Sequence, residues 1–282
     1  MTDPNPIRNV SDTALWVAIY RAIENERPDA LFNDPYARRL GGERGEAIAR
    51  TMPEGHWPIV VRTAVMDEIV MRCVQNGIAT VLNLAAGLDA RPYRLALPAS
   101  LRWLHVDLPD MVDYFRSGMS GETPRCELEF MAADLRDAAA RRDVFARAAA
   151  HGPVLVITEG LLVYLTANQV ADLASALHDI AGARYWLSDL ASPMLLKFLE
   201  KKWSPKLKAG NAPFQFGPAE GTAFFAPFGW REAEFRSTWT ESFRLQRTMR
   251  GAWLWKLLSL LQSRKRQEAG RRMSGIVLLE SA

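Results

Sequence analysis

The segment NLAAGLDARPYRL at residues 83–95 constrains this chain most, because an apolar run enters a turn of small residues followed by charged side chains. Gly87 tolerates positive φ and Ala85 carries only a methyl group, so the backbone of the turn can approach a ligand closely. The segment predicts a strand followed by a loop that binds a nucleoside cofactor. Turns of this kind also join strands to helices without binding anything, so the interpretation depends on the residues that follow.

Acidic residues close three further apolar runs. Asp107 follows LRWLHV about 20 residues after the turn, where a carboxylate can accept both ribose hydroxyls. Asp134 and Leu135 follow LEFMAA, and Glu159 follows PVLVIT, with Tyr164 shortly beyond it. In an open α/β sheet, ligands bind at the carboxyl ends of the strands. We therefore expect these residues to gather at one edge of a sheet, although ordinary capping of strands would leave the same pattern.

Composition narrows the class of protein. The 282 residues include no segment that resembles a linker, which favours one domain with an insertion. Net charge is +3 with acids and bases interspersed, which argues against a nucleic-acid partner. The first residues lack the basic and apolar regions of a signal peptide, and no apolar run reaches the roughly 18 residues of a membrane span. We expect a cytoplasmic protein.

Cysteine and histidine spacing predicts no metal site. Cys73 and Cys126 lie far apart without a CxxC motif, so we expect free thiols. The four histidines also lack the spacing of metal ligands.

Hydrophobic periodicity predicts alternating strands and helices. A first helix has Ser11, Asp12 and Thr13 as N-cap candidates, and a second runs over about 57–76 with Arg62 in its first half. Strands are expected near 80–84, 102–106, 127–132, 153–158 and 184–189, and in the tail at FRLQRTMR (243–250) and MSGIVLLES (273–281), with a helix between those two. The alternation implies a parallel sheet with right-handed crossovers, and the tail adds an antiparallel edge.

We divide the single domain, 1–282, into four parts by these patterns. They are an N-terminal helical cap at 1–76, a cofactor-binding core at 77–190, a lid insertion at 191–235, and C-terminal strands and a helix at 236–282. The lid lacks a strand period but is rich in aromatic residues, namely Trp203, Phe214, Phe216, Phe224, Phe225 and Phe228. Aromatic residues favour burial, so we expect a wall for an apolar substrate rather than a surface excursion.

The tail also contains a basic region from Arg244 to Arg272 around the apolar GAWLWKLLSLL. A helix packed on the sheet with solvated basic flanks is favoured over a helix that contacts a membrane surface or a partner.

Seven motifs occur in the order typical of one family. They are SDTALWVAIYRAIE, DPYA, VVRTAVMDEIV, NLAAGLDARPYRL, HVDLPDMV, AADLRD and TEGLLVYLT. With them the chain resembles the leucine carboxyl methyltransferase family, a class I S-adenosylmethionine-dependent branch that also includes bacterial polyketide carboxyl methyltransferases. The resemblance covers nearly the whole chain. It implies a doubly wound, Rossmann-like α/β fold whose sheet has seven mostly parallel strands, the last antiparallel.

The resemblance also implies S-adenosyl-L-methionine as the cofactor. Arg62 would bind its methionine carboxylate through the guanidinium fork. Ala85 and Gly87 would form the turn against it, and Asp107 would hold the ribose hydroxyls with Leu108 beside them.

The other contacts that the resemblance implies lie beyond the third and fourth strands. Asp134 would accept a hydrogen bond from the adenine amino group, and Leu135 would line the adenine pocket. Glu159 would face the methionine amino end or its water. Tyr164 would lie near the transferred methyl group, and we take Tyr164 and Glu159 as the candidate catalytic residues.

The chain departs from the family pattern twice. Family members commonly have Gly where Ala85 stands, although Gly87 is retained. Phosphatase-directed members carry a Lys near the position of Trp16 and Val17, and its absence favours the bacterial small-molecule branch.

The predicted function is therefore methyl transfer to a carboxylate or hydroxyl of a small molecule. A carboxylate acceptor is already ionised and needs no base. The motif TEGLLVYLT contains no His, which favours a carboxylate or an acidic phenol, although His178 or Glu220 could reach the site. One alternative is a methyltransferase that acts on a protein C-terminal carboxylate.

A further alternative is a nicotinamide-dependent oxidoreductase or a non-catalytic nucleoside-binding module on the same kind of sheet. The turn reads AxGxDxR rather than GxGxxG, and Asp89 and Arg91 would crowd the path of a pyrophosphate.

Overall fold

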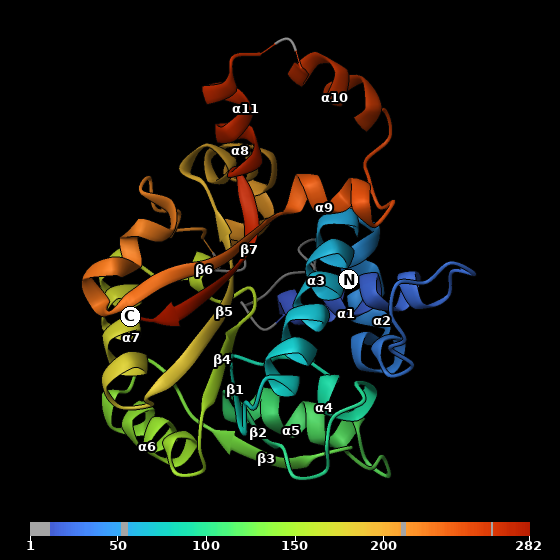
Figure 1. The fold of residues 1–282 in the computed structure, drawn as a ribbon. Coiled ribbons are helices and arrows are strands. Elements are labelled where there is room, and N and C mark those ends of the chain that lie inside the picture. Colours follow the sequence, from blue (N-terminus) through green and yellow to red (C-terminus); the bar gives the residue numbers. More distant parts are fainter. Residues whose placement is uncertain (1–11, 52–55, 210–212, 261) are drawn as a thin grey trace.

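Seven strands form one sheet in the order β3-β2-β1-β4-β5-β7-β6 (Figure 1). The computed structural model describes residues 12–51, 56–209, 213–260 and 262–282, with the backbone alone at 202–209 and 260. The strands are β1 (Thr80–Leu84), β2 (Arg102–Asp107), β3 (Glu127–Ala132), β4 (Val154–Thr158), β5 (Ala183–Ala191), β6 (Trp230–Ser237) and β7 (Ser274–Ser281). The first five are parallel, and β7 runs antiparallel to both β5 and β6. The predicted seven-stranded sheet with an antiparallel last strand is therefore confirmed.

Helices cover both faces of the sheet (Figure 1). The chain before the sheet forms α1 (Asp12–Asn25), α2 (Ala37–Arg50) and α3 (His56–Gln75). The crossovers contain α4 (Arg91–Arg94), α5 (Pro109–Gly118), α6 (Ala138–Ala149), α7 (Ala167–Asp179) and the short 3₁₀ segment η2 (Leu162–Tyr164). After β5 come α8 (Pro193–Ala209) and η3 (Gly221–Phe228), and between β6 and β7 lie α9 (Thr238–Arg244), α10 (Ala252–Leu260) and α11 (Arg264–Arg271).

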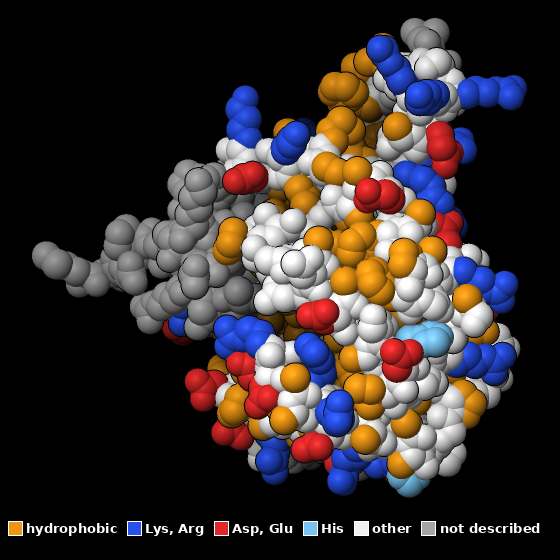
Figure 2. Space-filling view, turned by 90° about the vertical axis from the view of Figure 1, so that its left-hand side faces the viewer, with side chains coloured by type: hydrophobic (Ala, Val, Ile, Leu, Met, Phe, Trp, Pro, Cys, Tyr) orange, Lys and Arg blue, Asp and Glu red, His pale blue; other side chains and the backbone are white. Residues whose placement is uncertain are grey.

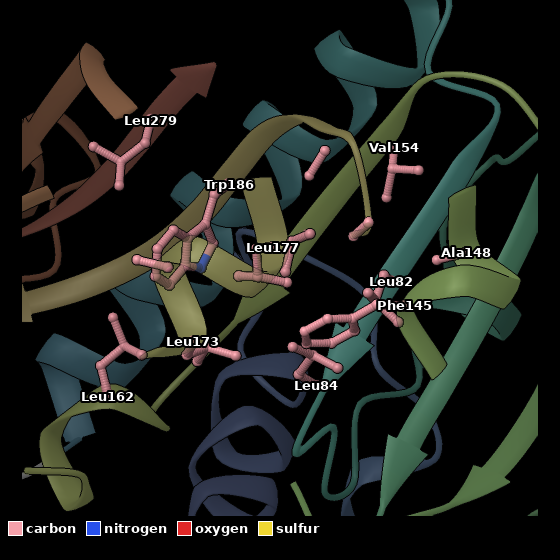
Figure 3. Packing of buried hydrophobic residues seen from close by; sticks show 14 of the residues in the cluster. Leu82, Leu84, Phe145, Ala148, Val154, Leu162, Leu173, Leu177, Trp186 and Leu279 are labelled. Carbon is pink, nitrogen blue, oxygen red and sulfur yellow. The ribbon is translucent and has the colours of Figure 1, made fainter. Parts of the chain in front are cut away.

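Alternation along the strands divides the core into two layers. Leu82 and Leu84 of β1 belong to the cluster that α6 and α7 cover, and Figure 3 shows Phe145 beside them. Val81, which points to the opposite face, belongs to the cluster that α3 covers. Because successive side chains of a strand point to opposite faces, every β1 side chain is buried between two helical layers. This burial holds β1 in place beside β4. The order of the strands in the sheet reverses between these two strands.

The sequence places the sixth strand wrongly. Residues 243–250 form the end of α9 and the turns after it, whereas β6 occupies 230–237, largely inside the predicted lid. β6 is an edge strand, and β7 is its one neighbour among the described strands. Its Arg231 forms an ion pair with Glu280, and Glu232 forms one with Arg272, so charged side chains conceal the apolar alternation. The Ser237 side chain then caps α9 by accepting from Thr240 N–H.

The predicted burial of the lid aromatics is confirmed for Phe216 and Phe225, whereas Phe214, Phe224 and Phe228 are half-buried, and most of these rings belong to the core. Phe216 and Phe225 are almost fully buried, and Phe224 and Phe228 pack against the same cluster as Trp186. Of the aromatics named in the prediction, Phe214 and Phe216 line the cavity considered below, and Phe198, a further aromatic of the lid, lines it too. The Trp203 side chain and the N-cap candidate Ser11 lie outside the residues that the structure describes.

Two other expectations have clear outcomes. Cys73 and Cys126 are buried free thiols, which confirms the prediction for both. The favoured packing of the GAWLWKLLSLL helix on the sheet is wrong, because α10 projects from the body and exposes Trp253, Leu254 and Leu257 (Figure 1). Among the described helices, none combines the length and apolarity needed to cross a bilayer.

Candidate active site

A cavity of about 2910 Å³ opens at the carboxyl ends of the parallel strands. Its lining contains every residue that the sequence assigned to the site: Arg62, Ala85, Gly87, Asp107, Leu108, Asp134, Leu135, Glu159 and Tyr164. These residues come from segments far apart in sequence. They meet because the order of the strands reverses between β1 and β4, which leaves a crevice at that edge of the sheet.

The turn after β1 has the unusual backbone that its small residues suggested. Ala85 has φ 49° and Gly87 has φ 55°, both in the left-handed region. A Cβ atom on residue 87 would lie 3.2 Å from the Ala14 methyl of α1, so the turn has little spare room. The backbone of this turn is therefore held close to the floor of the cavity.

Asp107 at the end of β2 holds that turn. Its Oδ2 accepts the Gly87 N–H and its Oδ1 accepts the Leu108 N–H, each at 2.7 Å. Burial raises the pKa of Asp107, and the two backbone donors partly offset that effect. A carboxylate oxygen can accept two hydrogen bonds, so each oxygen keeps capacity for a hydroxyl donor.

Arg62 of α3 reaches the opposite side of the crevice. Its Nε lies 3.0 Å from Glu159 Oε1, and its Nη1 donates to Asp189 Oδ2 at 3.1 Å. Asp189 also accepts the Gly160 N–H at 2.7 Å, which fixes the loop after β4. Within the described residues Nη2 of Arg62 makes no hydrogen bond, so the guanidinium retains donors for a ligand carboxylate.

A second arginine, Arg91, also contacts Glu159. The Arg91 guanidinium is almost fully buried and binds Asp67, Asp89 and Glu159 at 2.7–2.8 Å. Asp89 also accepts from Asn83, so both residues that distinguish this turn from a dinucleotide loop belong to the floor of the cavity. Burial opposes ionisation of Glu159, but Arg91 and Arg62 outweigh it and lower its pKa to about 2.

Asp134 and Leu135 lie at the end of β3. Both carboxylate oxygens of Asp134 accept from Arg136, which lowers the pKa of Asp134 through hydrogen bonding. Leu135 packs against the core layer beneath α6. An adenine amino group would have to share the Asp134 carboxylate with Arg136.

Tyr164 ends η2 and lies against the lid. Its ring is 5.6 Å from that of Phe214, and its hydroxyl interacts with Thr13 of α1. Burial raises the pKa of Tyr164, so the phenol keeps its proton at neutral pH. The group can therefore donate a hydrogen bond but does not serve as a base.

Three residues of the cavity were missed by the sequence analysis. Asp189 lies two residues before the end of β5, a position that the strand-end rule could have flagged. His56 begins α3 and lines the cavity, and burial lowers its pKa, so the imidazole is neutral at neutral pH. Thr13 contacts Tyr164, which no sequence signal could show. His178 and Glu220, the two suggested bases, do not line the cavity.

The arrangement matches the chemistry of S-adenosylmethionine. Asp107 has free acceptor capacity for ribose hydroxyls, Arg62 has free donors for a carboxylate, and the small turn residues allow close approach. Within the described residues no cluster of His, Cys, Asp and Glu could hold a metal ion. Fold and site together define a class I methyltransferase.

Comparison with known proteins identifies the family. The leucine carboxyl methyltransferase profile matches residues 14–178. A protein of Parafrankia sp. (strain EAN1pec), named as an S-adenosyl-L-methionine-dependent methyltransferase, is 32% identical over 81% of this chain and 79% of its own length. A similarly named protein of Saccharopolyspora erythraea is 32% identical over 80% of this chain and 84% of its length. The chain belongs to the leucine carboxyl methyltransferase family and is an S-adenosylmethionine-dependent methyltransferase.

Solved structures support the fold alone. A methyltransferase-like protein of Thermobifida fusca superposes with a TM-score of 0.59 at 16% identity, covering 98% of this chain and 96% of the other. A DUF574 family protein of Streptomyces avermitilis gives a TM-score of 0.59 at 15% identity, covering 94% and 97%.

Proposed function

We propose that this methyltransferase transfers a methyl group to an oxygen of a small molecule, either a carboxylate or a hydroxyl. One observation supports this proposal above all: the cavity of about 2910 Å³ is larger than the roughly 300–1,000 Å³ of a common small-ligand pocket. Its lining continues beyond the cofactor residues to Leu195 and Leu199 of α8 and Trp239 and Phe243 of α9. A second, largely apolar molecule therefore has room beside the cofactor.

The residues of the site divide the work of binding the cofactor. Asp107 accepts from the ribose hydroxyls while it holds the Gly87 turn in place. Arg62 binds the methionine carboxylate through its free donors. Glu159, kept ionised by Arg62 and Arg91, faces the methionine ammonium group.

The residues that would hold the adenine end of the cofactor are Leu108, Asp134 and Leu135 of the cavity lining. Leu135, which packs against the core, and Leu108, which is 40% exposed, would supply the apolar contacts of the adenine ring. Asp134 accepts from the adenine amino group and shares its carboxylate with Arg136.

When bound, the cofactor supplies a sulfonium methyl group that passes in line to the acceptor oxygen, with the S–C bonding electrons left on sulfur. The protein aligns the two molecules and excludes water, a contribution of about 7 kcal/mol or more in favourable systems. Tyr164 keeps its proton and donates a hydrogen bond to the acceptor, which orients the attacking oxygen.

The described lining favours a carboxylate acceptor. A carboxylate is ionised at neutral pH and needs no base. Glu159 is committed to Arg62 and Arg91, and Tyr164 retains its proton. His56 is the histidine of the lining, so a hydroxyl acceptor would depend on it as the base.

The decisive experiment uses the full chain with methyl-labelled S-adenosylmethionine and a panel of apolar carboxylic acids and phenols. Label that base treatment releases as methanol reports a methyl ester, and base-stable label reports an ether. We expect labelled small molecules, predominantly esters, and at least tenfold less label with Asp107→Ala at a cofactor concentration below its dissociation constant. Label retained only on protein would favour the alternative acceptor, a protein C-terminal carboxylate, and would overturn the small-molecule proposal.

A second measurement tests the part of Tyr164. Tyr164→Phe removes one hydrogen bond to the acceptor, so we expect turnover to fall about tenfold with unchanged affinity for S-adenosylhomocysteine. His56→Gln provides the comparison, since it leaves turnover unchanged for a carboxylate acceptor. A large loss with His56→Gln and none with Tyr164→Phe would instead indicate a hydroxyl acceptor with His56 as the base.

A further inference from the structure

The helix α10 has two faces with different surroundings. Trp255, Lys256 and Ser259 line the cavity. The opposite face consists of Trp253, Leu254, Leu257 and Leu258, which are 65%, 48%, 53% and 44% exposed and do not line it. Spacing of one and four residues puts these four side chains on one side of a helix. We call them the outer face of α10.

The outer face has no partner among the described residues. α10 belongs to the insertion between β6 and β7, which projects from the body of the molecule (Figure 1). Figure 2 shows hydrophobic side chains beside Lys and Arg on this projecting lobe. An apolar helix is usually buried in a core or an interface, so an exposed one marks a site of interaction.

The charges around α10 indicate the nature of the partner. Five exposed cations of the lobe form no ion pair with any described residue: Arg264 and Lys265, which lie outside the cavity lining, and Arg250, Arg266 and Arg271, which are part of it. Glu268 is the sole acid of the sequence between residues 245 and 272, and it lies 3.5 Å from Arg272. The lobe thus combines an apolar face with uncompensated positive charge.

We propose that the outer face of α10 docks on an anionic phospholipid surface. Trp and Leu on one face with Lys and Arg around it is the composition of helices that lie in the membrane interface. Nine residues are too few to cross a bilayer, which takes about 20, so the helix lies along the surface. A second copy of the chain fits less well, since a two-fold contact through this lobe would bring equal cations together.

Docking in this way also places the cavity near the lipid. The opposite face of α10 lines the mouth of the cavity, so one short helix joins the membrane surface to the acceptor side. The lipid contact itself does not depend on which molecule is methylated.

The test is co-sedimentation of the full chain with vesicles of mixed phosphatidylglycerol and phosphatidylcholine, compared with pure phosphatidylcholine. We expect binding to the anionic vesicles alone, weakened by high salt because ions screen the cations. Arg264→Gln combined with Lys265→Gln should lower the partition coefficient by about fivefold for each cation removed. Trp253→Ser combined with Leu257→Ser should abolish it.

Matched controls keep the result specific. Arg142→Gln removes an exposed cation of α6 that forms no ion pair with another described residue, and Ile23→Ser removes an exposed apolar side chain of α1. Both should bind vesicles like the wild type, and all variants should retain S-adenosylhomocysteine binding, which reports folding. No sedimentation with anionic vesicles, equal losses in the controls, or a dimer that the outer-face variant dissociates would each overturn the proposal.

Discussion

Asp107 and Gly87 are joined across 20 residues of sequence by a hydrogen bond of 2.7 Å from the Gly87 N–H to the Asp107 carboxylate. The bond connects the end of β2 to the turn after β1. It makes one carboxylate both a support for the turn and a candidate ribose acceptor. Loss of the Asp107 side chain should therefore weaken the cofactor site in two ways, by releasing the Gly87 turn and by removing the proposed acceptor for the ribose hydroxyls.

The backbone of Ala85 predicts a stabilising substitution. Its φ of 49° lies in the left-handed region, which costs an L-residue with a Cβ roughly 1–2 kcal/mol. Gly adopts this conformation freely, so Ala85→Gly should raise the free energy of unfolding by about 1 kcal/mol in urea titrations.

The neighbouring Ala86 provides the control for this substitution. Its φ is not positive, so Ala86→Gly should lower the free energy of unfolding by about 0.5–1 kcal/mol. If both substitutions destabilise the protein equally, the result contradicts a left-handed backbone conformation at Ala85.

Removal of the buried Arg91 charge should be severe. Arg91→Met leaves the carboxylates of Asp67, Asp89 and Glu159 close together without their shared cation. Breaking a buried ion pair costs about 3–5 kcal/mol, and we expect a loss of this size in chemical denaturation. Arg142→Met on the surface should change stability by less than about 0.5 kcal/mol. Similar small effects from both variants would contradict the buried network.

The strands of the sheet show which parts of the fold the sequence can predict. Strand periodicity predicted β1 at its observed bounds because every residue of this central strand is buried. β3 was also predicted at its observed bounds although it is an edge strand, because Leu128, Phe130 and Met131 keep its sequence largely apolar. The same rule failed for β6, whose exposed edge position gives its charged side chains ion-pair partners.

The residues of the site also divide into those that a local sequence pattern predicts and those that depend on tertiary packing. Gly87, Asp107 and Glu159 could be predicted because each stands at, or within three residues of, the carboxyl end of an apolar strand. The contact of Thr13 with Tyr164 depends on how α1 packs over the sheet, and no local pattern encodes it. Likewise, the exposure of α10 was missed because its apolar sequence alone suggests burial.

The buried His105 predicts a pH dependence of stability. Burial lowers its pKa to about 4, while the Asp89 carboxylate acts in the opposite direction. The unfolded chain binds the proton more readily below about pH 6.5, so stability falls by about 3 kcal/mol as pH drops from about 6.5 to about 4. His105→Phe should remove this part of the slope, because a phenyl ring binds no proton. The phenyl ring can keep the packing, since the imidazole that it replaces stacks on Phe115 with ring centroids 4.5 Å apart.

Urea unfolding at a series of pH values measures this slope directly. His151→Phe, at an exposed loop position, should leave it as in the wild type. An unchanged slope in His105→Phe would show that other groups cause the acid sensitivity.

Calorimetry with S-adenosylhomocysteine tests the central claim most directly, by comparing the wild type with Asp107→Ala and with Asp113→Ala. Asp113 is an exposed carboxylate of α5 outside the cavity lining, so its loss should leave affinity unchanged. Asp107→Ala removes a charge-assisted acceptor and the support of the Gly87 turn, for which we expect an affinity loss of about tenfold to a hundredfold. No binding by the wild type, or equal affinity for all three proteins, would contradict the proposed cofactor site.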